Sequence, residues 1–348
     1  MIKLFRKIRH KMLTENKFTK YFLYAIGEIF LVVIGILIAL NINNQNEQRI
    51  RKEKLDTIYI EVQRELALNI KSATTVIDYY EKQDSIVYLV LNDKLTKEDY
   101  VKNLYLGNVI EHYMDLNIQN KGYLMLTDKL DILPTSFKPI LKKLNIVYEA
   151  NKSDIDRINI DFTQFMRDKI TKMAGTKSWY VEFGYKQNLN DEILEYLVND
   201  PFYKNKVFEY LVYYQNLSLQ EFKVNAVMAY KALTELTGKK DDIDTSIYFQ
   251  TDEELSKYVG EFKINSNDAR FNEEGGDNII NIKVTDSQLY CILFGYMELE
   301  IFPHTENVFI HGDSDNAKYT FIQNVNGQIT GFQLFNESVY TDWTRIKK

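Results

Sequence analysis

The most strongly patterned part of the sequence is an apolar stretch near its beginning. Residues 21–40 carry one charged side chain, Glu28. At a rise of about 1.5 Å per residue, a helix of this length matches the roughly 30 Å hydrocarbon core of a bilayer. The pattern therefore predicts a transmembrane helix, which we place at residues 21–43.

The charge on the two sides of this stretch is unequal. Seven basic residues and one acid, Glu15, precede residue 21, and the next basic residue after the stretch is Arg49. Positive flanks stay on the cytoplasmic side, so we expect residues 1–20 to be cytoplasmic and the body of the chain to lie outside the cytoplasm. The apolar run exceeds the usual length of about 7–15 residues in a signal peptide, and Leu37 stands where a cleavage site needs a small residue. We therefore expect an uncleaved signal anchor.

Three residues of the predicted span are candidates for a role inside the membrane. Glu28 lies in its cytoplasmic third, where two interpretations stay open. It is an ionisable site, such as a proton relay or a contact to a partner helix, or it is a protonated carboxyl that reaches the headgroups or a second copy. Gly35 and Ala39 form a pair of small residues that allows close approach of a second helix. A homo-oligomer is therefore one hypothesis.

The residues after the span have helical periodicity. A single helix is predicted over about residues 47–92, with an apolar stripe that is interrupted only near Asp84. Its apolar positions are Leu55, Ile58, Val62, Leu66, Ile70, Ala73, Ile77, Tyr80, Val87 and Leu91.

Further helices are expected up to residue 237. Residues 120–134 carry turn residues at both ends and stay open between helix and loop. Amphipathic helices of this length bury their stripes against one another, which favours an antiparallel bundle over residues 44–240. The next predicted helix starts at the N-cap Thr96 and runs toward Leu106, and another runs from Pro134 to just before Gly175, with a less regular step near Asn151. A short helix ends at Asp200-Pro201, and a last one covers residues 202–237 and is stopped by Gly238.

The pattern changes after a charged linker, residues 241–254. Apolar runs of five to eight residues replace the helical period, and Asn326-Gly327 is a strong hairpin signal. We expect a small antiparallel barrel or curled sheet over residues 255–348. The aromatic residues of "EYLVYYQN" and "FQLF" either line an apolar ligand pocket or fill the core. The expected strands are "YVGEFKI", "NIINIKV", "QLYCILF", "MELEIF", "NVFIHG", "KYTFIQN", "QITGFQLF" and "YTDWTRI".

Two parts of the sequence resemble known families. The opening "MIKLFRKIRH" and the segment "YAIGEIFLVVIGILIALNINNQNE" resemble the start of a family of uncharacterised single-pass membrane proteins of Gram-negative bacteria. That resemblance implies an inner-membrane anchor with a periplasmic body and assigns no activity. Gln45 stands where that family usually has a tryptophan. The spacing of the strand motifs after residue 255 resembles the lipocalin-like β-domain that follows serine hydrolases of the β-lactamase type.

Composition narrows the classes of partner. The net charge of the whole chain is -6, although residues 1–40 carry seven basic and two acidic side chains. The acidic remainder is unsuited to nucleic acid, which needs clustered Lys and Arg. The single cysteine, Cys291, lies in the apolar run "LYCILF" and allows no disulfide within the chain.

A search for catalytic motifs identifies no reaction. The hydrolase motifs S-x-x-K and K-T-G are absent, and Ser314-Asp315-Asn316 stands alone as a loop. His304 and His311, with Asp313 or Asp315, are a possible metal set, and we interpret them instead as polar loop histidines. The carboxylate clusters Glu192, Glu195 and Asp200, and Asp241, Asp242 and Asp244, are interpreted as solvated faces.

These observations predict an α+β protein with a transmembrane helix, an extracytoplasmic helical bundle and a C-terminal β-domain. We expect no cofactor and no metal. The leading hypothesis is non-enzymatic binding or scaffolding in the cell envelope, with the bilayer and an envelope protein or a second copy as partners. A small-ligand sensor that signals through a membrane partner is the second hypothesis, and an envelope hydrolase with an unfamiliar site is the third.

Overall fold

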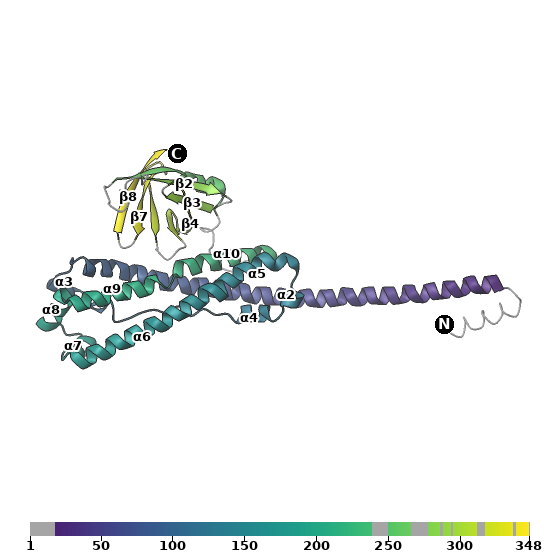
Figure 1. The fold of residues 1–348 in the computed structure, drawn as a ribbon, viewed down its shortest axis with the longest axis horizontal. Helices are drawn as coiled ribbons and strands as arrows, with labels where there is room; N and C mark the ends of the chain where they lie inside the picture. Colours follow the sequence, from purple (N-terminus) through teal and green to yellow (C-terminus); the bar gives the residue numbers. More distant parts are fainter. Residues whose placement is uncertain are drawn as a thin grey trace. The chain divides into compact units, whose positions relative to one another are not determined.

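The computed structural model is of the α+β class, with helices first and a closed antiparallel barrel after them (Figure 1). It describes residues 18–238, 250–265, 278–285, 288–293, 295–311, 317–336 and 339–347. The chain divides into two compact units, Met1–Ile58 and Tyr59–Lys348. Helix α2, Phe18–Leu91, contributes residues to both. Residues 1–17 and 239–249, which hold most of the basic segment and of the predicted linker, lie outside the described residues.

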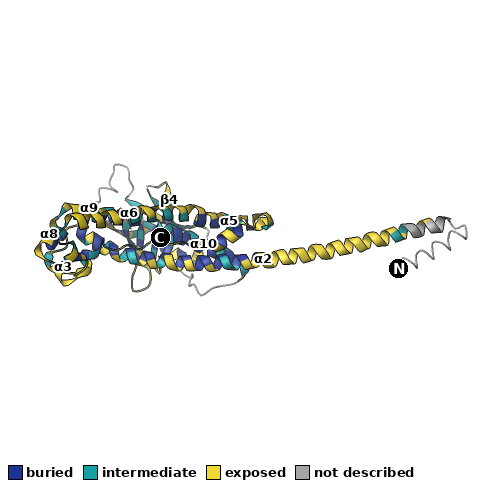
Figure 2. Cartoon of the chain, turned by 90° about the horizontal axis from the view of Figure 1, so that it is seen from below, coloured by how far each residue is buried: buried dark blue, intermediate teal, exposed yellow. Residues whose placement is uncertain are grey.

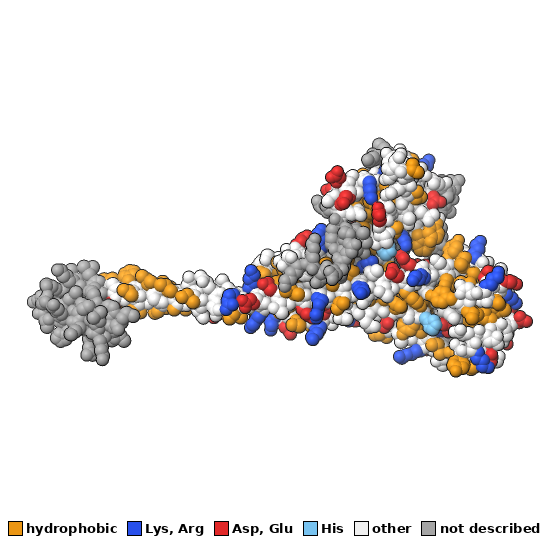
Figure 3. Space-filling view, turned by 180° about the vertical axis from the view of Figure 1, so that it is seen from behind, with side chains coloured by type: hydrophobic (Ala, Val, Ile, Leu, Met, Phe, Trp, Pro, Cys, Tyr) orange, Lys and Arg blue, Asp and Glu red, His pale blue; other side chains and the backbone are white. Residues whose placement is uncertain are grey.

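The first unit contains the apolar stretch. Within the described residues, α2 is the helix that is long and apolar enough to cross a membrane. The large apolar side chains of residues 29–42 are exposed, and those of Phe30, Leu37 and Leu40 are more than half exposed. Hydrophobic side chains gather on the visible face of this part of the helix in Figure 3, and Figure 2 colours it as exposed. A helix that is apolar on all its sides and exposed on all of them is typical of a membrane span.

Three of the helices in the second unit have a clear cap at one end. Thr96 is the N-cap of α3 as expected, and it forms a reciprocal capping box with Asp99. Asp200 caps α9, with Pro201 in its first turn, and Gly238 ends α10 at a φ of 66°. The helices are α3 (Lys97–Lys102), α4 (Lys121–Thr127), α5 (Lys138–Asn145), α6 (Lys152–Thr176), α7 (Tyr180–Gly184), α8 (Asp191–Asn199), α9 (Pro201–Gln215), α10 (Leu219–Thr237) and α11 (Asp252–Leu255).

The prediction of one helix over residues 202–237 is wrong. The structure has two helices there, α9 and α10, because the chain turns at Ser218, whose φ is 48°. A left-handed residue ends one helix and lets the next start in a new direction. The sequence hides this turn, because a serine gives no sign that its backbone is left-handed.

The helix expected after Pro134 is also interrupted. Helices α5 and α6 are joined by a π-helical turn, Ile146–Asn151, which lies where the apolar spacing is irregular. The turn directs the buried Asn151 toward α10, where its amide donates to Glu221 at 2.8 Å and its oxygen accepts from Asn225 at 2.9 Å. Gly175 lies within α6 and does not end it, so the predicted end is two residues too early.

The apolar stripe of α2 is the centre of the helical core. Its predicted positions from Leu55 to Val87 are all buried, as the dark blue side of the helix in Figure 2 shows. The segment left open at residues 120–134 packs on this helix and forms α4. The buried Glu65 carboxylate accepts from the backbone N–H of Gly122 at 2.7 Å. A Cβ at Gly122 would lie 3.1 Å from the backbone nitrogen of Val62, so the close approach favours glycine.

The eight expected strands form a closed barrel in which neighbours in sequence are neighbours in space. Strands β1 and β8 close it, with Phe262 opposite Arg345. The hairpin at Asn326-Gly327 is confirmed, with Gly327 at a φ of 75°. The strands are β1 (Gly260–Ile264), β2 (Ile279–Thr285), β3 (Gln288–Leu293), β4 (Met297–Thr305), β5 (Val308–His311), β6 (Lys318–Gln323), β7 (Ile329–Asn336) and β8 (Val339–Lys347).

Aromatic side chains fill the interior of the barrel. The ring of Phe321 lies 5.6 Å from that of Phe309 and 5.4 Å from that of Phe332, centroid to centroid. Phe332 also stacks on Trp343 at 5.7 Å. Cys291 is fully buried among these residues, and burial raises the pKa of its thiol to about 12. The described interior is therefore a packed core.

Candidate functional site

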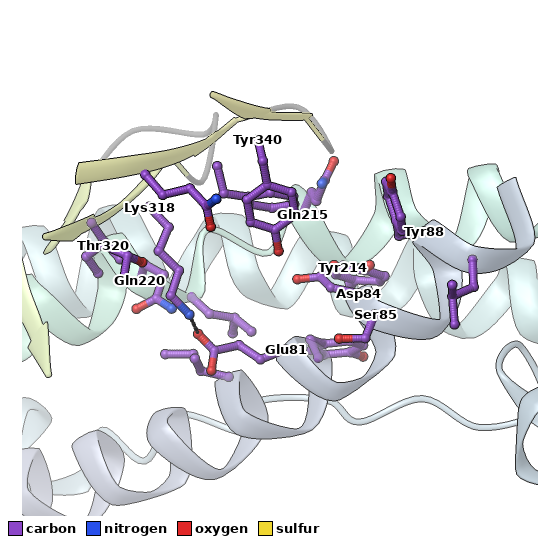
Figure 4. A pocket seen from close by; sticks show the side chains of 17 residues that line it. Glu81, Asp84, Ser85, Tyr88, Tyr214, Gln215, Gln220, Lys318, Thr320 and Tyr340 are labelled. Carbon is purple, nitrogen blue, oxygen red and sulfur yellow. Dashed lines mark hydrogen bonds and ion pairs between the residues drawn. The ribbon is translucent and has the colours of Figure 1, made fainter. Parts of the chain in front are cut away.

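The gap in the apolar stripe of α2 lies beside a cavity. Residues three or four apart share one face of a helix, so Glu81, Asp84, Ser85 and Tyr88 follow Ile77 along the same side. All five line a cavity of about 630 Å³ (Figure 4). An interrupted stripe was thus the one signal in the sequence that pointed to this place. The residues that complete the cavity come from distant parts of the chain.

The other walls come from the junction of α9 and α10 and from the barrel. The left-handed turn at Ser218 places the end of α9 and the start of α10 side by side at the cavity. Strands β5 to β8 supply the opposite wall, with Lys318 and Tyr340 labelled in Figure 4. The lining residues outside α2 are Tyr214, Gln215, Leu219, Gln220, Ile310, Lys318, Thr320, Gln333, Phe335 and Tyr340.

A group of three charged or titratable side chains joins α2 to the barrel at one end of the cavity. Glu81 Oε1 accepts from Lys318 Nζ at 2.9 Å and lies 3.3 Å from His304 Nε2. The hydrogen bond from His304, together with that from Lys318, outweighs the effect of burial and lowers the pKa of Glu81 to about 2. Glu81 is therefore ionised at neutral pH, and its charge is balanced.

Asp84, one turn further along α2, has a different environment. The hydroxyl of Tyr214 donates to Asp84 Oδ1, and the ring of Tyr214 stacks on that of Tyr80 at 4.6 Å. Burial raises the pKa of Asp84 to about 6, and the hydrogen bond from Tyr214 opposes this rise. The carboxyl group therefore titrates just below neutral pH.

Tyr80 and Tyr210 hold the tyrosine cluster in place beneath the cavity. Tyr80 Oη donates to the carbonyl of Met114 at 2.7 Å and accepts from its N–H at 3.0 Å. Tyr210 Oη donates to the carbonyl of His112 at 3.0 Å. These bonds fix the rings against the irregular segment between α3 and α4, so the floor under Asp84 and Tyr214 is formed by packed aromatic residues.

The residues chosen from the sequence lie elsewhere. Glu28, partly exposed, and Gly35 and Ala39, both exposed, belong to the first unit. A Cβ on Gly35 would meet nothing within 4 Å, so this face of α2 is open in a single copy of the chain. The interpretations of these three residues stay predictions.

The histidine pair was misread as loop residues. His304 lies on β4 and His311 on β5, and both are buried, with exposed fractions of 7% and 8%. Asp313 and Asp315 lie outside the described residues. Across the described ranges no group of three or more His, Cys, Asp or Glu side chains is placed to hold a metal ion.

In the first acidic cluster Glu192 and Glu195 are exposed, as interpreted from the sequence, and Asp200 is partly buried. Glu195 forms an ion pair with Lys97 at 2.7 Å, and Asp200 with Lys177 at 3.6 Å. Asp200 also accepts from the N–H of Phe202 at 2.7 Å as the cap of α9. Residues 241–244 and the Ser314-Asp315-Asn316 triplet lie outside the described residues.

The two aromatic segments were expected either to line a ligand pocket or to fill the core, and each of them contributes residues to both. In "EYLVYYQN", Tyr210 is wholly buried in the helical core, whereas Tyr214 and Gln215 face the cavity. In "FQLF", Phe332 fills the barrel and Phe335 lines the cavity. The sequence identified the right segments, but it gave no sign that the two segments meet.

Comparisons with known proteins were made for the whole chain. No protein-family model, no curated protein and no solved structure matches it.

Proposed function

We propose that this chain is a membrane-anchored, non-catalytic binding protein of the cell envelope, and that the cavity beside Glu81 and Asp84 is its binding site. The observation that carries the proposal is the composition of the cavity. At about 630 Å³ it falls in the size range of small-molecule sites, and it combines aromatic walls with a few polar groups.

The anchor and the compartment are supported by sequence features. The exposed apolar stretch of α2 has the length of a membrane span, and the basic residues before it favour a cytoplasmic N-terminus. The resemblance of residues 1–50 to single-pass inner-membrane proteins is in agreement with this. In this proposal the second unit faces the periplasm.

Topology is tested by two reporters fused after residue 348, one active only outside the cytoplasm and one active only inside it. We expect the outside reporter alone to be active. Activity of the inside reporter alone would overturn the anchor orientation and the compartment.

Ligand binding is tested with a cysteine in the cavity. Ser85 lines the cavity, whereas Ser72 is an exposed residue of the same helix. In native membranes, a low-molecular-mass extract of the host cells should slow the labelling of a Ser85→Cys chain by an uncharged thiol reagent. The Ser72→Cys chain should label at an unchanged rate. Equal rates with and without extract at both positions would contradict a small-molecule site.

A small-ligand sensor is the second candidate function, and the continuity of α2 from the apolar stretch to the cavity favours it. The same helix contains the apolar stretch and the cavity residues Glu81 and Asp84. In this candidate function, a membrane partner carries the output of the sensor. Crosslinking in native membranes through Gly35→Cys, with Gly184→Cys as a control outside the span, should then recover a second protein at the span position only. Recovery of none would contradict the sensor.

A further inference from the structure

The charges that line the cavity do not cancel. Among its described lining residues the charged ones are Glu81, Asp84 and Lys318. Lys318 lies 2.9 Å from the Glu81 carboxylate, and these two neutralise each other. Asp84 receives a hydrogen bond from the uncharged Tyr214, and no salt bridge joins it to a described residue; the charges of Glu81 and Lys318 act on it only at longer range and in opposite directions. A carboxylate at the wall of a cavity, without a cation, is a feature that a positively charged ligand would complete.

Aromatic rings stand on both sides of this carboxylate. Figure 4 shows Tyr214 beside Asp84, Tyr88 further along α2 and Tyr340 facing them from the barrel. The faces of aromatic rings attract cations by about 0.5–2 kcal/mol, and more strongly where water is excluded. Phe335 adds a further ring to the same wall.

The remainder of the lining is suited to hydrocarbon. Ile77, Leu89, Leu219 and Ile310 line the cavity from three different parts of the chain. A ligand with one charged end and an apolar body would bury the body against these side chains, at about 25 cal/mol for each Å² removed from water. Inorganic cations offer no such apolar body and would use only part of the site.

We propose that the cavity binds an organic ammonium ion, with its cationic head at Asp84 between the tyrosine rings and its hydrocarbon part against the apolar side chains. This inference rests on the proposed function, because it assumes that the cavity is a small-molecule site. It adds the chemical class of the ligand.

The binding should depend on pH in a defined direction. The pKa of Asp84 is raised to about 6 by burial, and a bound cation would lower it by favouring the ionised carboxylate. Affinity for the ammonium ion should therefore be full above about pH 7 and fall as the pH drops below 6. An uncharged ligand would show no such loss.

The test uses the full chain in its own membranes, with Ser85→Cys as the reporter thiol. Cys291 is the chain's one cysteine and is buried, so the introduced thiol is the reactive one. The probes are 4-phenylbutylamine, which is an ammonium ion at pH 7.5, and the uncharged 4-phenylbutan-1-ol. The readout is the concentration of each that halves the rate of labelling by an uncharged methanethiosulfonate.

We expect the amine to protect Ser85→Cys at a concentration at least tenfold lower than the alcohol, and to leave Ser72→Cys unaffected. Adding Asp84→Asn, which keeps an oxygen acceptor for Tyr214, should remove the difference between the probes while the alcohol still protects. At pH 5 the preference for the amine should shrink.

Two outcomes would overturn the ammonium inference and leave the proposed function in place. One is equal protection by the two probes with no effect of Asp84→Asn. The other is protection by the cell extract without protection by the amine. Failure of the extract and of both probes would overturn the binding function as well as the ligand class.

Discussion

Asp84 and Glu81 are two carboxyl groups on one face of α2 whose pKa values are shifted in opposite directions. Glu81 meets Lys318 and His304, which lower its pKa to about 2. Burial raises the pKa of Asp84 to about 6, which the hydrogen bond from Tyr214 and the more distant charge of Lys318 only partly oppose. The difference comes from the neighbours, since both side chains are partly buried. The same helix therefore presents a balanced charge and an unbalanced one.

The free energy of unfolding should decrease as the pH rises and Asp84 loses its proton. A folded pKa above the ordinary value means that the folded state holds the proton more tightly. Its stabilising effect is full below about pH 4 and is lost as the pH rises through 6. Asp84→Asn should remove this dependence, so the variant should gain on the order of 2 kcal/mol relative to the wild type between pH 4 and pH 7.5.

Thermal unfolding of the full chain at the two pH values checks this prediction. Asp161→Asn, at an exposed position of α6, is the control and should show no comparable gain. A gain of equal size for both variants would mean that Asp84 is not held in a special environment.

At the scale of elements, two backbone positions decide how neighbouring segments meet. Ser218 takes a left-handed conformation between α9 and α10, and its side chain makes no capping hydrogen bond. Gly331 of β7 lies so close to β8 that a Cβ would be 2.2 Å from the carbonyl oxygen of Trp343. A side chain fits at Ser218 at a cost in conformational free energy, whereas a side chain at Gly331 would clash with the neighbouring strand.

Ser218→Gly should stabilise the protein slightly. A left-handed conformation costs a residue with a Cβ about 1–2 kcal/mol, and the greater flexibility of unfolded glycine offsets part of the gain. We expect a net gain of about 0.5 kcal/mol in chemical unfolding. Ser72→Gly, in the middle of α2, should lose a similar amount, because glycine is a poor helix former. A loss at both positions would show that Ser218 is not strained.

Gly331→Ala should destabilise the barrel strongly. The added methyl group would push β7 from β8 and disturb the pairing of Gly331 with Thr344. Overpacking of this kind costs about 1–3 kcal/mol. Gly175→Ala in α6, where a Cβ meets nothing within 4 Å, is the control and should be stabilising. Chemical unfolding of both variants measures the contrast, and a neutral Gly331→Ala would contradict the close approach.

At the scale of the whole molecule, the second unit joins a helical body and a barrel through charged and polar contacts. Lys318 of β6 and His304 of β4 both reach Glu81 of α2. The cavity lies at the same junction and takes walls from both parts. A change in this contact should therefore change the cavity.

Glu81→Gln should loosen the barrel from the helical body. The amide leaves Lys318 without its counter-charge, and we expect a loss of about 1–2 kcal/mol at neutral pH. Because the pKa of Glu81 is lowered, its contribution is present above about pH 4.5 and disappears as the pH falls toward 2. Hydrogen exchange in β6, measured at pH 7 and corrected for the intrinsic rate, should be faster in the variant.

Glu53→Gln is the matched control for this prediction. Glu53 pairs with Arg49 at 3.0 Å on an exposed face of α2, where such pairs contribute little. Exchange in β6 should be unchanged in this variant. If the two variants behave alike, the Glu81 contact does not hold the barrel in place.

Elements with local signals could be predicted from the residues alone. The apolar stripe of α2, the N-cap at Thr96, the hairpin at Asn326-Gly327 and all eight strands follow from residue spacing, since periodicity and turn chemistry act over a few residues. The left-handed Ser218 and the π-helical turn before Asn151 do not, because they depend on packing against neighbours distant in sequence.

Almost all of the candidate site consists of residues that only the tertiary structure brings together. In the sequence, the gap in the apolar stripe near Asp84 is a signal of this site. The two aromatic segments are also recognisable there, but nothing in the sequence shows that they lie close together. Lys318 and Glu81 are 237 residues apart, and Tyr214 and Asp84 are 130 apart. Side chains so distant meet only when the barrel and the helices pack together, and the same packing excludes the water that would otherwise give Asp84 its ordinary pKa.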